Sequence, residues 1–177
     1  MGNIFSVIGA LMLLGIASLG INTMLVDKTS TMLEAEASLN AISIAQSMID
    51  EIETKSYDAA TANGTRIFDS TLFTAPNALG PSNTEQSNVL LPDTSSPFKS
   101  DKYYNDMDDY HKYTRIVSTP VMGKFTVLDT VYYGTEANPD TKSNIQTNYK
   151  KIIVTVTHAN MSYPLKLSDI VVYRKYF

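Results

Sequence analysis

The chain has 177 residues, a formal net charge of −4 and no cysteine. This length builds one globular core, and the absence of cysteine excludes disulfides and thiolate metal sites. The negative charge argues against nucleic acid as the main partner.

Residues 1–55 are predicted to form one long helix with two chemically different halves. Residues 4–26 (IFSVIGALMLLGIASLGINTMLV) carry no charge. Such a run of about 23 residues spans a bilayer as a helix. A signal peptide is disfavoured because nothing basic precedes Ile4 and the run is too long. A buried helix of a soluble protein is the remaining alternative to a transmembrane or filament-core segment.

From residue 27 to residue 52 the apolar residues thin into a stripe at spacings of three and four. This spacing places them on one helical face, which we expect to pack against the rest of the protein. No proline occurs before Pro76, so nothing breaks the helix between its halves. The stripe consists of Met32, Ala35, Leu39, Ile42, Ala45, Ile49 and Ile52.

The middle segment, residues 65–105, is irregular and rich in proline, serine, threonine and asparagine. A loop this long in a small domain is either a functional surface or a segment that wraps the head. Short apolar stretches around Ile67, Leu72 and Val89 are expected to pin it against the helix or to form one short strand.

The last third is predicted to be an antiparallel sheet, residues 113–177, with strands at 113–118, 124–133, 151–158 and 165–173. The last two are expected to pair as a hairpin. One face of such a sheet needs a cover, and the helix stripe supplies it. The sequence therefore predicts an α+β fold, with helix 1–55 packed on a head formed by residues 56–177. The expected helix–sheet contacts are Leu39, Ile42, Ile49 and Ile52 against Ile152, Val154 and Val156.

Asp106, Asp108 and Asp109 place three carboxylates within four residues, which makes a calcium site conceivable. A solvated acidic turn is the alternative, because the glycine and the terminal glutamate of an EF-hand loop are missing. His111 lies beside them, but no serine has a nucleophile motif around it. We therefore expect a surface histidine, no enzymatic activity and no cofactor.

Two further patterns have both a functional and a structural interpretation. Lys150 and Lys151, together with Arg174 and Lys175, form a basic spot suited to DNA, or they are edge-strand residues that prevent sheet aggregation. Asn63 and Asn160 begin Asn-Gly-Thr and Asn-Met-Ser, which fit the glycosylation pattern but often occur by chance.

Several of these segments together resemble the type IV pilin-like family, which includes the pseudopilins of type II secretion systems. The similarity lies in the uncharged N-terminal helix, its continuation at residues 41–58 (AISIAQSMIDEIETKSYD), and the C-terminal sheet. Residues 104–113 (YNDMDDYHKY) are similar to an acidic turn that precedes the sheet in some of these proteins, and residues 150–175 to their final hairpin.

The resemblance implies a subunit that is held in the inner membrane and then polymerises, with bundled helices inside and heads outside. It also implies identical subunits, an assembly platform and a prepilin peptidase as partners. The implied assembly core is Ile4, Phe5, Val7, Ile8, Leu11, Leu13, Leu14, Ile16, Leu19, Ile21 and Leu25.

The chain departs from the family pattern at two points. The family carries glutamate at the fifth position of the mature chain, where this chain has Phe5, or Val7 if cleavage follows Gly2. Many bacterial pilins have a proline near position 22, where this chain has Asn22. We expect a structural subunit of an extracellular filament, with a monomeric membrane-anchored envelope protein or a secretion pseudopilin as the alternatives.

Overall fold

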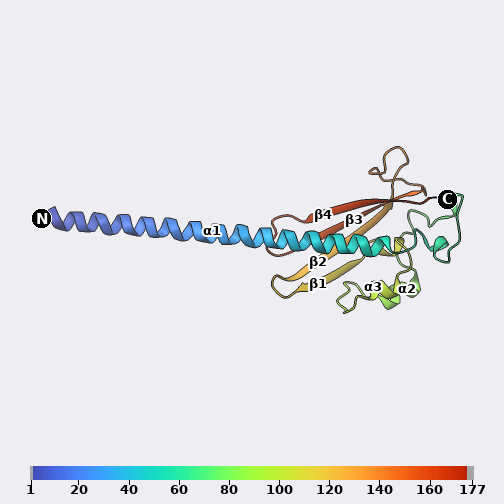
Figure 1. The fold of residues 1–177 in the computed structure, drawn as a ribbon, viewed down its shortest axis with the longest axis horizontal. Coiled ribbons are helices and arrows are strands. Elements are labelled where there is room, and N and C mark those ends of the chain that lie inside the picture. The colour runs from blue at the N-terminus through green and yellow to red at the C-terminus, as the bar shows by residue number, and fades with distance from the viewer. Residues whose placement is uncertain (1, 175–177) are drawn as a thin grey trace.

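A computed structural model describes residues 2–174, so Met1 and residues 175–177 of the predicted segments lie outside the described residues. Helix α1 covers Gly2–Glu53 without a break and projects far beyond the head (Figure 1). At 1.5 Å per residue it extends roughly 78 Å. The single long helix predicted from the apolar run is confirmed.

The sheet has four strands, β1 (Thr114–Thr119), β2 (Gly123–Tyr133), β3 (Tyr149–Thr157) and β4 (Leu165–Val172). They lie in the order β1-β2-β3-β4, and each pairs antiparallel with the next. The predicted strands and the final hairpin are confirmed, with boundaries that move by one or two residues. The fold is α+β, with α1 packed against an antiparallel sheet.

Alternation along the strands separates the two faces of the sheet. On β3, Ile152, Val154 and Val156 are completely buried, whereas Ile153 and Thr155 on the other face are half-buried. The buried face is the one that α1 covers, and the other face is rich in threonine and lysine. This arrangement is typical of an antiparallel sheet with one covered side.

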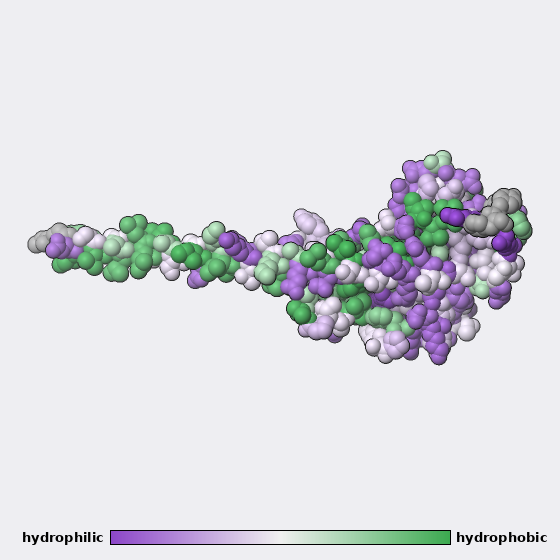
Figure 2. Space-filling model, in the orientation of Figure 1, coloured by the Kyte–Doolittle hydropathy of each residue, from purple (hydrophilic) through white to green (hydrophobic). Residues whose placement is uncertain are grey.

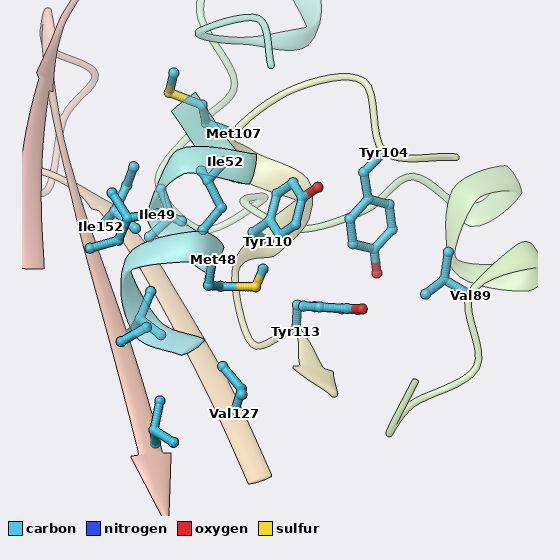
Figure 3. Packing of buried hydrophobic residues seen from close by; sticks show 14 of the residues in the cluster. Met48, Ile49, Ile52, Val89, Tyr104, Met107, Tyr110, Tyr113, Val127 and Ile152 are labelled. Atoms are coloured by element: carbon cyan, nitrogen blue, oxygen red, sulfur yellow. The ribbon is translucent and has the colours of Figure 1, made fainter. Parts of the chain in front are cut away.

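The helix face that meets the sheet consists of Ala37, Ala41, Ala45, Met48, Ile49 and Ile52, all buried. In Figure 3, Ile49 lies beside Ile152, whereas Met48 and Ile52 lie toward the tyrosine rings. Ile49 and Ile52 are buried in the same cluster as Ile152, Val154 and Val156, as predicted.

The prediction was wrong for Leu39 and Ile42, which are 67% and 47% exposed. Leu39 lies two residues from both Ala37 and Ala41, which puts it on nearly the opposite side of the helix. Small alanines let the helix backbone approach the sheet closely, so the sheet-facing side is the less hydrophobic one here. In the predicted stripe, Met32, Leu39 and Ile42 point away from the head, whereas Ala45, Ile49 and Ile52 are buried against it.

The middle segment contains the short helices α2 (Asn83–Asn88) and α3 (Lys99–Tyr103) and the 3-10 turn η2 (Ser70–Leu72). Among the described residues, the middle segment adds no strand to the sheet, so the short strand, one of the two alternatives, is absent. The segment wraps the head instead. The backbone N–H of Asp93 donates to Thr114 O at 2.8 Å, and Asp93 O accepts from Ile116 N at 2.9 Å, along the edge of β1.

A second core lies between α1 and this wrapping segment. The rings of Tyr104, Tyr110 and Tyr113 meet edge to face, with centroids 5.1–5.6 Å apart. Tyr110 belongs to η3 (Asp108–Tyr110), the turn that carries the acidic residues. The tyrosines join the helix core to Val89 (Figure 3), so the wrapping segment is part of the fold.

Candidate functional site

The projecting half of α1 is an exposed apolar surface (Figure 2). Every residue predicted for the assembly core is between 46% and 74% exposed, and Leu13 is 70% exposed. Within residues 2–174, one helix, Asn3–Glu53, has the length and composition to cross a membrane. An apolar surface of this size is compatible with a membrane anchor or a signal sequence.

Hydroxyl groups in this half of the helix bond to its own backbone. Ser6 Oγ donates to Asn3 O at 3.0 Å, and Thr23 Oγ1 lies 3.0 Å from Gly20 O and 3.2 Å from Leu19 O. Such internal bonds leave these hydroxyls satisfied where no water is available. The polar residues of the segment are therefore compatible with an apolar environment.

Exposed apolar side chains also occur on the part of α1 that carries the head, beyond the polar residues 27–31. Met32, Ala35, Leu39 and Ile42 form what we call the outward stripe, and all four are exposed. They lie outside the buried alanine face, with Met32 and Leu39 nearly opposite to it, so the helix contacts its own head on one side and has exposed apolar residues on another. Exposed apolar surface of this kind marks an interaction site.

A buried lysine fixes the base of the helix to the head. Lys150 is fully buried, and its Nζ donates to Asp108 Oδ1 and to Tyr57 O and lies 3.3 Å from Asp58 Oδ2. The same ammonium lies 4.3 Å from the centroid of the Tyr57 ring. We call Lys150, Asp58 and Asp108 the lysine hub.

The edge-lysine interpretation is wrong for Lys150, because β3 is an inner strand and Lys150 is on its covered face. Lys151 points to the other face and forms an ion pair with Asp140. The two adjacent lysines therefore have different environments and form no joint basic spot.

The interpretation of the acidic turn as solvated is also wrong. Asp106, Asp108 and Asp109 are each only 2% exposed. Asp106 Oδ1 accepts from Asp108 N at 2.7 Å, and Asp109 Oδ2 accepts from Asn105 N at 2.9 Å. Burial raises the pKa of Asp106 to about 8 and that of Asp109 to about 6.

The calcium prediction gains no support from this geometry. Within the part of the chain that the structure describes, no three histidine, aspartate or glutamate side chains are placed to hold a metal ion. Asp108 is directed to Lys150, while Asp106 and Asp109 accept hydrogen bonds from backbone N–H groups of their own turn. The turn is therefore a folded polar junction.

A second polar tether joins α1 to the head. Glu51 Oε2 lies 2.6 Å from Arg115 Nη1, and Glu51 Oε1 accepts from Ser100 Oγ and Tyr110 Oη, each at 2.9 Å. Asp129 lies nearby on β2 and is fully buried, and this burial raises its pKa well above the usual range. The sequence analysis missed this tether because its members come from four separate elements.

The two histidines and the two sequons occupy different structural settings. His111 Nδ1 accepts from Val131 N at 3.3 Å, and desolvation lowers its pKa. His158 stacks on Phe125 with centroids 4.3 Å apart. Asn63 is exposed in a turn, while Asn160 lies beside α1, where Ser162 N donates to Glu34 Oε1 at 3.1 Å.

Comparison of the chain with protein-family models, with curated proteins and with solved structures returned no match.

Proposed function

We propose that this chain is the structural subunit of an extracellular, type IV pilus-like filament, with α1 in the polymer core and the heads outside. Before assembly, the apolar half of α1 lies in the inner membrane. Identical subunits are then the main partner, together with a prepilin peptidase and an assembly platform. The chain performs no chemistry in this role.

One observation carries the proposal. After the polar residues 27–31, exposed apolar side chains return on α1 as the outward stripe, beside a head whose own core is formed without them. A monomeric anchor needs only the span, because its head would face water. A second set of exposed apolar residues on the same helix instead matches burial against copies of that helix.

The energies involved are large enough to drive assembly. Burying one leucine, isoleucine or methionine side chain contributes about 1.5–3 kcal/mol. Leu39, Ile42 and Met32 are 67%, 47% and 71% exposed in the single chain, so most of that gain is still available. A repeated contact that does not close on itself then produces a helical polymer.

The apolar run of residues 4–26, which includes Phe5 and Val7, contains no carboxylate, and this is the main departure from the family pattern. In the family that carboxylate faces a neighbour's terminal amine, and an unpaired charge in an apolar core is costly. This departure favours a dedicated or unconventional assembly system. It leaves the membrane-anchored monomer and the secretion pseudopilin as the competing functions.

The proposal is tested with Leu39→Asp, which lies beyond the apolar run and outside the contact with the head. Sheared cell-surface material is imaged by negative-stain microscopy, and its fibres are identified by peptide mass spectrometry. We expect ordered fibres of the unaltered chain and none of Leu39→Asp, although the variant still enters the membrane fraction.

Leu72→Asp is the matched control, because Leu72 is 63% exposed on the head and receives the same charge. It should polymerise normally. A detergent-soluble monomer from the unaltered chain, with no fibres under any condition, would establish the anchored-monomer alternative.

A further inference from the structure

The two hairpin turns of the sheet lie at the same end of the head. The β1–β2 turn (residues 120–122) and the β3–β4 turn (residues 158–164) both extend along α1 toward its projecting half (Figure 1). His158 Nε2 lies 2.7 Å from Met122 O, so the two turns are neighbours. We call these two turns the hairpin rim. The β2–β3 connection, residues 134–148, lies at the opposite end of the strands.

The hairpin rim carries the two most exposed large apolar side chains of the residues that the structure describes. Tyr163 is 82% exposed and Val121 is 79% exposed, whereas no large apolar side chain of residues 3–26 exceeds 74%. Apolar side chains that gather at one end of a head mark a contact surface. Tyrosine in particular is enriched where a protein meets the polar layer of a bilayer, because its ring is amphipathic.

The rim lies at the height of α1 where the apolar run has just ended. The β3–β4 turn lines a groove with Ser30 and Glu34, and Ser162 N donates to Glu34 Oε1 at 3.1 Å. Ser30 and Glu34 lie about 6 Å and about 12 Å beyond Val26 along the helix axis. The polar layer on each side of a bilayer's hydrocarbon core is about 5–8 Å thick. The turn therefore begins within this layer when residues 4–26 span the core.

The charge of the rim also suits lipid headgroups. Residues 119–124 and 157–166 contain no acidic residue, in a chain whose formal net charge is −4. They carry two lysines, Lys124 and Lys166, and both are exposed. Lysine side chains near a membrane surface are attracted to anionic headgroups, and their alkyl stems can lie along apolar surface. The rim thus combines exposed apolar groups with positive charge.

We propose that the hairpin rim rests on the polar headgroup layer of the bilayer that holds α1. The side chains of Tyr163 and Val121 lie among the headgroups, and Lys124 and Lys166 lie near the lipid phosphates. This contact orients the head before assembly and is released when the subunit leaves the membrane. The inference rests on the membrane stage of the proposed function and names the partner of the head at that stage.

The chain contains no tryptophan, so a single introduced tryptophan reports on one position. The full chain is reconstituted in vesicles of phosphatidylcholine and phosphatidylglycerol, with and without a lipid that carries a nitroxide quencher on its headgroup. Tyr163→Trp and Val121→Trp should each lose about half of their fluorescence to this quencher, because interfacial aromatic side chains lie at headgroup level. Both positions are highly exposed, so neither change should disturb the fold.

Two further variants separate the rim from the rest of the molecule. Ile145→Trp is the matched control, since Ile145 is 68% exposed in the β2–β3 connection at the opposite end of the head. It should keep its fluorescence in the presence of the headgroup quencher. Leu13→Trp reports on insertion of α1 and should be quenched by lipids that are brominated deep in their acyl chains.

Quenching of Leu13→Trp with none at Tyr163→Trp and Val121→Trp would overturn the rim contact and leave the filament proposal intact. Headgroup quenching of Ile145→Trp as strong as that of the rim variants would overturn it too, because the head would then lie on the bilayer without a preferred orientation. A blue-shifted but unquenched emission from the rim variants would assign the rim to another copy of the chain instead. Absence of quenching at Leu13→Trp would overturn the membrane stage itself, so the two proposals fail distinguishably.

Discussion

Lys150 places one ammonium group between two buried carboxylates from distant parts of the chain, Asp58 and Asp108. Together they join the start of the head, the acidic turn and the central strand β3. Removing one partner of a buried ion pair leaves a charge uncompensated and costs about 3–5 kcal/mol. The lysine hub therefore holds the head together more than any exposed ion pair does.

We expect Lys150→Met to lower the free energy of unfolding by about 3–5 kcal/mol, because two carboxylates lose their counter-charge. Lys151→Met, one residue away on the exposed face, loses only a contact with a largely solvated Asp140 and should cost under about 1 kcal/mol. Urea denaturation followed by circular dichroism measures both. Equal losses would mean that the ammonium of Lys150 is not needed to balance the hub.

The stability of the head should fall between pH 5 and pH 8. The pKa of Asp106 is raised to about 8 and that of Asp109 to about 6. In this range these groups bind more protons in the folded chain than in the unfolded one, so raising the pH favours unfolding. We expect a loss on the order of 5 kcal/mol in the free energy of unfolding, most of it from Asp106, measured by urea denaturation at the two pH values.

Other titratable groups also change the free energy of unfolding with pH, and the direction of each change follows from its pKa shift. The lowered pKa of Asp58 and Asp93 matters only below about pH 4, where protonation removes their stabilisation. The lowered pKa of His111 opposes the trend near pH 6, but this residue is only half-buried. Asp106→Asn should flatten the pH dependence, because Asp106 has the larger raised pKa of the two, and an unchanged slope would show that the acidic turn does not cause it.

At the scale of elements, helix α1 has two apolar faces with different tasks. The alanine face lies against the sheet, and the outward stripe lies opposite to it. A larger side chain on the alanine face should push the helix away from the sheet. A smaller side chain in the outward stripe should leave the free energy of unfolding of the single chain unchanged.

Ala41→Leu should therefore lower the free energy of unfolding by about 1–3 kcal/mol through overpacking, since Ala41 is completely buried. Leu39→Ala should change it by less than about 0.5 kcal/mol, because the side chain is 67% exposed. Thermal denaturation in detergent compares the two. A larger effect from Leu39→Ala would place the outward stripe against the head.

Periodicity in the sequence was sufficient to predict the elements but not every contact between them. The charge-free run predicted the projecting helix, and strict alternation predicted that Ile152 and Val154 share the covered face. The predicted stripe of α1 is correct at Ala45, Ile49 and Ile52, but its earlier part was assigned to the wrong side because hydrophobicity favoured Leu39 over Ala41. Close packing here depends on small size, which an apolar pattern does not distinguish.

The polar junctions were harder to predict. Lys150 is in phase with Ile152 on β3, so alternation alone could have identified it as buried, and Lys151 as a neighbour on the other face of the sheet. Its partners could not be found in this way, because Asp58 and Asp108 lie 92 and 42 residues away in sequence. The short spacing of Asp106, Asp108 and Asp109 suggested a metal site. In the fold these side chains instead contact Lys150 and backbone N–H groups of their own turn.

At the scale of the whole molecule, the projecting half of α1 and the head meet only where the helix reaches the sheet. Glu34, which accepts from Ser162 N, is the first α1 side chain along the sequence with a hydrogen bond to the head. The apolar residues before it are exposed and contribute no side chain to the buried core. Stability of the head and burial of the apolar half are therefore separable properties.

A chain that begins at Thr29 should fold as a soluble monomer without detergent, with a free energy of unfolding within about 0.5 kcal/mol of the full chain. A chain that begins at Asn40 loses the Glu34 contact and the packing of Ala37, and should melt several degrees lower. Size-exclusion chromatography and thermal denaturation measure both. Neither should form fibres, because the apolar run of residues 4–26, which supplies most of the surface that copies would bury against one another, is gone. Fibres from the Thr29 chain equal to those of the full chain would show that the heads polymerise without the apolar helix, and aggregation of that chain as an unfolded species would show that the head depends on it.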